Sequence, residues 1–235
     1  MFSNLKDIAS LIKEETRLLI GRHEGSVGWF RHKWPDITIS RASEIVIEGA
    51  PSSGNSFAAI AFITAQDREI HVAHHQHLPF QVTLACKMNI PCLVLIREPV
   101  DAIVSRVSRY GYYQPRTNQA MLWVNYSLRH WLMFYTSILR YRPSFEICDF
   151  KELIRDYGSV IERVNIKFGV RFHAPSAQVG AQSLSTLADG VKPDRNRDAR
   201  KSIFKEWVYH EEAFRSSFQR ASDLYAAIRA TSSHD

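Results

Sequence analysis

The chain has 235 residues, of which 45% are hydrophobic and 23% are charged, a balance typical of a globular domain with a substantial core. Its 30 basic and 24 acidic residues give a formal net charge of +6, which suits an anionic ligand. The sequence has no Lys/Arg-dense helical stretch with interleaved aromatic residues, which argues against a nucleic-acid-binding protein.

Residues 1–40 predict an N-terminal extension that is part helical and part irregular. Apolar residues recur at near-helical spacing over 3–20, which predicts a helix. The segment 21–35, in which Trp29, Phe30 and Trp34 stand among basic residues, is expected to be irregular.

From residue 45 the pattern alternates between strands and helices. Short apolar runs predict strands at 45–48, 69–73 and 92–96, and the stretches after them predict helices at 54–66, 78–88 and 99–109. Strands that alternate with helices pair in parallel through right-handed crossovers. We therefore expect an α/β fold of three layers, with a mostly parallel sheet flanked by helices.

The second half of the chain continues this pattern. It predicts a loop at 111–119, a helix at 120–141, a strand at 145–148, a helix at 157–168 and one or two helices over 199–230. The polar segment 175–201 predicts a loop that could act as a lid. No internal repeat is evident, so we expect a single domain over 1–235.

Cysteine usage indicates the compartment. Cys86, Cys92 and Cys148 cannot all pair with one another, which favours a reducing environment. No stretch has the length of a membrane span or the apolar core of a signal peptide. We therefore expect a cytoplasmic protein without a transmembrane segment.

A loop of small residues separates the strand at 45–48 from the helix that follows. Its small and polar members are Gly49, Pro51, Ser52, Ser53, Gly54, Asn55 and Ser56. A strand, a small-residue loop and a helix together aim unpaired backbone N–H groups at a phosphate or sulfate. A small P-loop kinase is one alternative, but its motif ends in Gly-Lys-Ser/Thr and this loop contains no lysine.

A second anion-binding signature begins at Arg97, directly after the strand at 92–96. Pro99 opens the next helix at a position that needs no N–H donor, and Ser105 lies about two turns into that helix. A guanidinium fork and a hydroxyl both suit phosphate oxygens. Parallel strands bring their carboxyl ends to one edge, so Arg97, the small-residue loop and the histidines at 74–77 should share a site.

These residues resemble the sulfotransferases that use 3′-phosphoadenosine-5′-phosphosulfate (PAPS). The family's phosphosulfate loop, Pro-Lys/Arg-Ser-Gly-Thr-Thr/Ser-aromatic, is similar to Pro-Ser-Ser-Gly-Asn-Ser-Phe at 51–57. Its 3′-phosphate motif, Arg-Asx/Glu-Pro-x-Asp-x-x-x-Ser, is matched at every defined position by 97–105. His77-Leu78-Pro79-Phe80 looks like its Lys-Thr-His-Leu-Pro segment, and 148–153 resembles its Tyr-Glu-Asp-Leu turn. The resemblance covers about residues 44–170.

The resemblance implies a P-loop NTPase-like sulfotransferase fold and the transfer of a sulfonate group from PAPS to an acceptor hydroxyl or amine. It implies that the 5′-phosphosulfate is bound by Ser52, Ser53, Gly54, Asn55, Ser56 and Phe57. It also implies that Arg97 and Ser105 bind the 3′-phosphate. The acceptor class stays open between a small molecule, a carbohydrate and a lipid, and no oligomeric state is assigned.

His77 is the implied general base. An imidazole with an unperturbed pKa near 6.5 can accept a hydroxyl proton at neutral pH. His71, His74 and His75 leave a metal site as an alternative, because His75 and His77 would share one face of a strand. A convincing third ligand does not stand out, and we expect no metal.

Ser52 departs from the family pattern, because it replaces the Lys or Arg that contacts the sulfonate oxygens. Losing one preorganised donor of this kind commonly lowers the rate about 10²–10³-fold. One possibility is that another cation supplies the charge, either His75, a catalytic candidate beside His77 and Ser52, or a basic residue of the C-terminal region. The alternative is a nucleotide-binding sulfotransferase homologue without turnover.

The basic segment 192–201 resembles in position the arginine-containing segment that closes over the 3′-phosphate in the family. Arg195 and Arg197 are the predicted cofactor-binding residues there, with Arg200 and Lys201 beside them. The alternative is a solvated run of charges.

Overall fold

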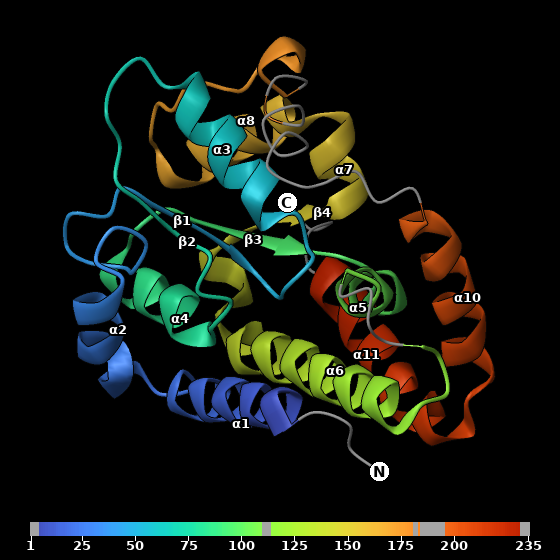
Figure 1. Ribbon diagram of the computed structural model, residues 1–235. Helices are drawn as coiled ribbons and strands as arrows, with labels where there is room; N and C mark the ends of the chain where they lie inside the picture. The colour runs from blue at the N-terminus through green and yellow to red at the C-terminus, as the bar shows by residue number, and fades with distance from the viewer. Residues whose placement is uncertain (1–4, 110–113, 181–182, 184–195, 231–235) are drawn as a thin grey trace.

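A sheet of four parallel strands forms the centre of the protein (Figure 1). The computed structural model describes residues 5–109, 114–180, 183 and 196–230. The strands are β1 (Ile45–Gly49), β2 (Val72–His74), β3 (Cys92–Ile96) and β4 (Glu146–Asp149), and their order across the sheet is β2-β1-β3-β4. Since β1 lies between β2 and β3, the loop that follows β1 lies between the segments that follow its two neighbours.

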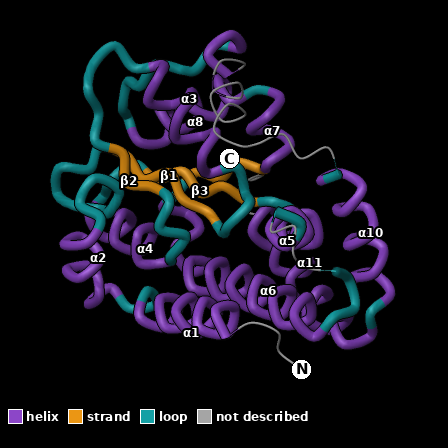
Figure 2. The backbone as a smooth tube through the Cα atoms, in the orientation of Figure 1, coloured by secondary structure: helices purple, strands orange, loops and turns teal. Residues whose placement is uncertain are grey.

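Helices cover both faces of the sheet, which gives the three layers seen in Figures 1 and 2. One face is covered by α3 (Asn55–Ala65), α7 (Phe150–Arg155) and α8 (Tyr157–Phe168). The other is covered by α4 (Pro79–Met88), α5 (Pro99–Val107), α6 (Asn118–Ile138) and α11 (Glu212–Ala230). Around this second layer lie α1 (Leu5–Ile20), which contacts α6, and α10 (Arg197–His210), which contacts α5. The described residues also form η1 (Glu24–Ser26), α2 (Val27–Lys33) and η2 (Leu139–Ser144).

The strands are buried on both faces, and successive side chains enter two separate cores. Val46 and Val94 pack on the α6 side, whereas Ile47 and Leu95 pack on the α3 side. This alternation follows from the two-residue period of a strand. Burial on both sides explains why the strands read as continuous apolar runs in the sequence.

The predicted α/β fold with a parallel sheet flanked by helices is confirmed. The predicted bounds are met at 92–96 for β3 and at 157–168 for α8. Pro99 is the first residue of α5, and the Glu98 carboxylate caps that helix by accepting a hydrogen bond from the Asp101 N–H at 2.8 Å. The end of β3 and the start of α5 therefore fix Arg97 at the sheet edge.

Four predictions of local structure were wrong. The segment 21–35 is not irregular throughout, because it contains η1 and α2. The second strand covers 72–74 rather than 69–73. Residues 150–155 form a helix, α7, whereas the resemblance placed a turn at 148–153. The expected lid loop at 175–201 is helical at 177–180 and from 197 onward, and most of the rest lies outside the described residues.

Within the part of the chain that the structure describes, no helix has the length and apolar character needed to cross a membrane.

Candidate functional site

Three segments that were predicted to share a site follow the carboxyl ends of adjacent strands. The small-residue loop follows β1, the histidine turn at 74–77 begins at the end of β2, and Arg97 directly follows β3. In open α/β sheets this edge is where ligands bind. The strand order places the small-residue loop between the other two segments.

The small-residue loop curls tightly before α3 begins. Ser52 has a φ of 67° and Gly54 a φ of 97°, both in the left-handed region that glycine adopts most readily. A Cβ atom at Gly54 would lie 2.5 Å from Cδ2 of Leu153 in α7. Gly54 therefore serves both the backbone turn and the close approach of α7, and the next residue begins α3.

Tyr135 of α6 supports this loop from inside the protein. Its hydroxyl donates to the Leu95 carbonyl at 2.7 Å and accepts from the Ala50 N–H at 3.3 Å. The Ser53 hydroxyl lies 3.3 Å from the same oxygen. Ser53 is fully buried, so its hydroxyl faces Tyr135. Tyr135 thus joins the end of β3 to the loop after β1.

Asn55, the first residue of α3, also holds the loop. It is 4% exposed, and its Nδ2 donates to the Ala50 carbonyl at 3.1 Å. Its Oδ1 is buried and has no hydrogen-bond partner among the described residues. The side chains of Ser53 and Asn55 therefore shape the loop from within, whereas Ser52 and Ser56 are more accessible.

Arg97 reaches directly to the small-residue loop. Its Nη1 donates to the Ser52 carbonyl at 3.1 Å, and its guanidinium carbon lies 4.0 Å from the centroid of the Phe150 ring. This distance allows a cation–π contact, which places the positive charge of Arg97 beside the loop. Ser105 is buried in α5, in the helix that Arg97 precedes.

His75 connects the histidine turn to the helix after the loop. Its Nε2 lies 2.8 Å from Oγ of Ser56, and its Nδ1 lies 2.6 Å from Nδ1 of His74. Burial lowers the pKa of His75, and burial together with the neighbouring His75 lowers the pKa of His74 to about 4. Both imidazoles are therefore neutral at pH 7 in the protein alone.

His77 is held with one ring nitrogen engaged. Its Nδ1 lies 2.9 Å from the Gly49 carbonyl, which can only accept, so Nδ1 carries the hydrogen. The lone pair of the neutral ring is then on Nε2. Burial lowers the pKa of His77 to about 3, although the Gly49 carbonyl opposes this shift. The ring is therefore a neutral proton acceptor at physiological pH.

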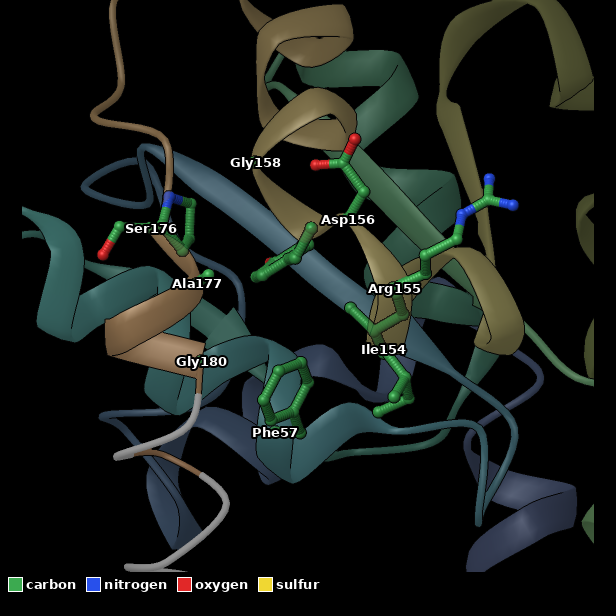
Figure 3. Close-up of a pocket in the computed structure, with 11 residues that line it drawn as sticks. Phe57, Ile154, Arg155, Asp156, Gly158, Ser176, Ala177 and Gly180 are labelled. Atoms are coloured by element: carbon green, nitrogen blue, oxygen red, sulfur yellow. The ribbon is translucent and has the colours of Figure 1, made fainter.

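A cavity of about 250 Å³ lies on the α3 side of the sheet, beside the first turn of α3 (Figure 3). It is lined by Phe57, by residues 153–158 at the junction of α7 and α8, and by residues 175–177 and Gly180. Its volume is below the range usual for a whole small-molecule ligand, so it is suited to one part of a ligand. Phe57 connects it to the predicted phosphosulfate loop.

Only some of the cofactor-binding residues predicted near the C-terminus belong to the part of the chain that the structure describes. Arg195 lies outside the described residues, and Arg197 begins α10 but its side chain is not described. Arg200 donates to the Ser108 carbonyl from Nε at 3.4 Å and from Nη2 at 3.3 Å. The start of α10 thus lies against the end of α5, the helix that carries Ser105.

The predicted alternative of a metal site at the histidines was compared with the described part of the chain. Among those residues, no group of three or more His, Cys, Asp or Glu is arranged to hold a metal ion.

No model of a protein family and no curated protein sequence matches the chain. Among solved structures, it is similar to mouse sulfotransferase SULT7A1 complexed with PAP, with a TM-score of 0.56 and 14% sequence identity. The match covers 90% of this chain and 93% of the mouse chain. The protein therefore has the α/β fold of a sulfotransferase, with a four-stranded parallel sheet flanked by helices.

Proposed function

We propose that the protein is a sulfotransferase that moves the sulfonate group of PAPS to an acceptor hydroxyl or amine. The observation that carries this proposal is the hydrogen bond between Arg97 and the Ser52 carbonyl. It joins the residue predicted to bind the 3′-phosphate to the loop predicted to bind the 5′-phosphosulfate. The fold is consistent with this assignment, since the similar mouse sulfotransferase is complexed with PAP.

The nucleotide would lie along the carboxyl edge of the sheet. Backbone N–H groups of the loop and of the first turn of α3 would bind the 5′-phosphosulfate, together with the hydroxyls of Ser52 and Ser56. Arg97 and Ser105 would bind the 3′-phosphate. The cavity beside Phe57 would take the base. Ser53, Gly54 and Asn55 would keep the loop in shape, as their burial and backbone angles support.

His77 would act as the general base in the transfer. The acceptor oxygen forms a bond to sulfur while the bond from sulfur to the phosphate oxygen breaks, and the acceptor proton passes to Nε2 of His77. Burial makes this imidazole a weak base in the protein alone. A bound anionic donor raises its pKa, because a nearby negative charge favours the imidazolium.

His75 would supply the positive charge that Ser52 cannot. It is neutral when buried beside His74, but its Nε2 faces Ser56 at the start of α3, where the phosphosulfate would bind. The charge of the donor would raise the pKa of His75 and favour its protonation. We therefore expect a proton to be taken up when PAPS binds.

The nucleotide assignment is tested by thermal melting with adenosine 3′,5′-bisphosphate (PAP). At 100 times its dissociation constant PAP should stabilise the protein by about 2.7 kcal/mol, which raises Tm by about 5–10 °C for a chain of this size.

Arg97→Ala should weaken PAP binding about 10–100-fold, since a hydrogen bond to a charged group contributes about 1.5–3 kcal/mol.

Two controls accompany this measurement. Adenosine 5′-monophosphate lacks the 3′-phosphate, so Arg97→Ala should weaken its binding less than it weakens the binding of PAP; any loss that remains reports the contact of Arg97 with the Ser52 carbonyl. Arg140→Ala removes an exposed arginine that lies over Tyr141, away from the site, and should leave PAP binding unchanged. Absence of any Tm shift at millimolar PAP would rule out the cofactor assignment.

The role of His75 is tested by turnover of PAPS with a panel of phenol, sugar and lipid acceptors. His75→Ala should lower kcat about 10²-fold, the usual effect of losing one preorganised electrostatic contact. PAP release would be measured as the product common to all acceptors. An unchanged kcat in His75→Ala would show that the charge comes from elsewhere.

A nucleotide-binding homologue without turnover is the second candidate. It is favoured by the loop itself, because residues 50–56 include no basic side chain and the neighbouring histidines are neutral. Ser52→Lys separates the two candidates. If His75 supplies the charge, the substitution should raise kcat by less than about tenfold, whereas an inactive homologue should gain far more or gain activity for the first time.

A further inference from the structure

We propose that Glu48, Arg17 and His130 are positioning residues that hold the backbone of Gln76 and His77 and thereby aim the imidazole of His77. This role in catalysis rests on the proposed function, in which His77 is the base. The three side chains come from β1, α1 and α6, so the turn is held from three directions.

The side chains bind every backbone polar group of Gln76 and His77. The two side-chain oxygens of Glu48 accept from the Gln76 N–H at 2.8 Å and from the His77 N–H at 2.7 Å. Arg17 donates to the Gln76 carbonyl at 2.7 Å, and Nε2 of His130 lies 2.8 Å from the His77 carbonyl. These groups have no partner in a helix or strand, because β2 ends at His74 and α4 begins at Pro79.

The turn needs this support because its backbone is strained. His75 has a φ of 59° and His77 a φ of 54°, and left-handed backbone is unfavourable for side chains other than glycine. Such conformations persist where surrounding contacts impose them, and they cluster at functional sites. Glu48 makes the contact that constrains both N–H groups at once.

His130 is set up to donate by a second contact. Nη1 of Arg106 lies 3.1 Å from Nδ1 of His130, and a guanidinium can only donate. Nδ1 of His130 is therefore the acceptor, and its Nε2 carries the hydrogen that goes to the His77 carbonyl. Arg106 belongs to α5, the helix that also carries the predicted 3′-phosphate residue Ser105.

Glu48 also ties the base to the donor loop. Glu48 holds the His77 N–H, and Gly49, the next residue, accepts from the His77 ring. Gly49 is also the first residue of the small-residue loop. The imidazole and the phosphosulfate loop are thus both fixed to the last two residues of β1, which sets the distance between base and sulfur. Displacements of about 1 Å in such an arrangement can cost about 10²-fold in rate.

The test compares Glu48→Gln with Glu44→Gln in the full chain. The two proteins are compared at pH 9, above the pKa of Glu48 at about 8, so that Glu48 is a carboxylate and both of its oxygens accept. In Glu48→Gln, the side-chain amide can accept from only one of the two N–H groups, and its NH₂ opposes the other. We expect kcat for PAPS turnover to fall about 10²-fold in Glu48→Gln, with the dissociation constant of PAP changed less than about threefold. Glu44 directly precedes the same strand and pairs with Arg68 at the surface, so Glu44→Gln should match the original protein.

A second readout does not depend on turnover. The ¹⁵N chemical shifts of the His77 ring should show the tautomer protonated at Nδ1 in the original protein and a mixture of tautomers in Glu48→Gln. If Glu48→Gln does not fold, the proposal is tested instead by comparing His130→Gln with His130→Leu. An amide N–H can replace the donation to the His77 carbonyl, so His130→Gln should retain kcat within about fivefold and His130→Leu should not.

The proposal is overturned if Glu48→Gln, or His130→Leu, keeps both kcat and the His77 tautomer of the original protein. It is also overturned if kcat falls only in proportion to PAP affinity. Failure of the original protein to bind PAP or to turn over PAPS would instead refute the proposed function, and the tautomer would still decide whether these side chains position His77.

Discussion

Ser52, His75 and His77 lie at the candidate site with left-handed backbones. None of them is glycine, so each conformation costs free energy that neighbouring contacts must offset. Arg97 holds the Ser52 carbonyl, and Glu48 holds the His77 N–H. At the scale of single residues, the site is therefore a set of unfavourable turns held by ionisable side chains from other elements.

The buried histidines predict that the protein loses stability in acid. The pKa values of His74 and His77, about 4 and about 3, lie below the unfolded value near 6.5. Between these values the unfolded chain binds more protons than the folded protein. The histidines should therefore leave the free energy of unfolding at its highest above pH 6.5 and lower it as pH falls toward 3. Urea denaturation across this range measures the slope, which should be shallower in His77→Gln.

Glu48 predicts the opposite slope at higher pH. Burial raises its pKa to about 8 from the usual 4.5, although the N–H groups of Gln76 and His77 oppose the shift. The folded protein then binds more protons than the unfolded chain between these values. Its contribution to stability is full below pH 4.5 and is lost as pH rises through 8. Glu48→Gln should remove this slope, and a slope that persists would contradict the assignment.

At the scale of single residues, distinctive spacing and composition single out Arg97 and the loop at 51–57 in the sequence. The structure brings the two together, and their binding roles stay predictions. Tyr135 and Glu48 were missed as parts of the site. Tyr135 looked like a core aromatic and Glu48 like the last polar residue of a strand, because the partners that define them are distant in sequence.

At the scale of elements, the small-residue loop depends on the close approach of α7. Gly54→Ala should destabilise the protein by more than about 1–2 kcal/mol, the cost of a left-handed alanine, because the new Cβ also meets Leu153. The measurement is urea denaturation together with PAP affinity, which should fall as the loop shifts.

Gly28→Ala is the matched substitution for this prediction. Gly28 lies in α2, and a Cβ there would meet nothing within 4 Å. It should raise the free energy of unfolding by up to about 1 kcal/mol, because alanine is the better helix former. Equal changes in the free energy of unfolding for the two substitutions would show that a side chain at residue 54 causes no strain.

The elements that sequence reasoning misplaced have physical explanations. The second strand begins at Val72 because its partner strand begins opposite it, with Ile45 paired to Val72, so residues 69–71 have no strand beside them. α2 forms despite two nearby glycines because its residue Phe30 is fully buried in the core, and this packing offsets the low helix propensity of glycine. α7 has only six residues, too few for helical periodicity to register.

At the scale of the whole molecule, the two cores share one sheet, and we expect the chain to unfold as a single domain. The core on the α6 side holds Trp123, Trp131 and Trp207, and the core on the α3 side holds the free thiol of Cys148. If the cores unfold together, tryptophan fluorescence and labelling of Cys148, followed by mass spectrometry, should give one urea midpoint. Separate midpoints would show two folding units.

The fold as a whole was predictable because the alternation of strands and helices spans most of the chain. Each buried strand reads as an apolar run, and parallel pairing requires helices between them. The layering around α1 and α10 was not predictable, because it depends on which helix surfaces pack against α6 and α5. The sequence predicts a site at the sheet edge, where the structure brings the loop and Arg97 together, but the supporting contacts could not be inferred from it.

The contact made by Arg17 has a consequence for handling the protein. It reaches from α1 to the Gln76 carbonyl, so the first helix contacts the histidine turn. Trimming of the amino end, proteolysis, or a bulky purification tag that unwinds this helix would remove the hydrogen bond from Arg17 to this turn. An inactive preparation of a shortened chain would then say little about the chemistry of the intact protein.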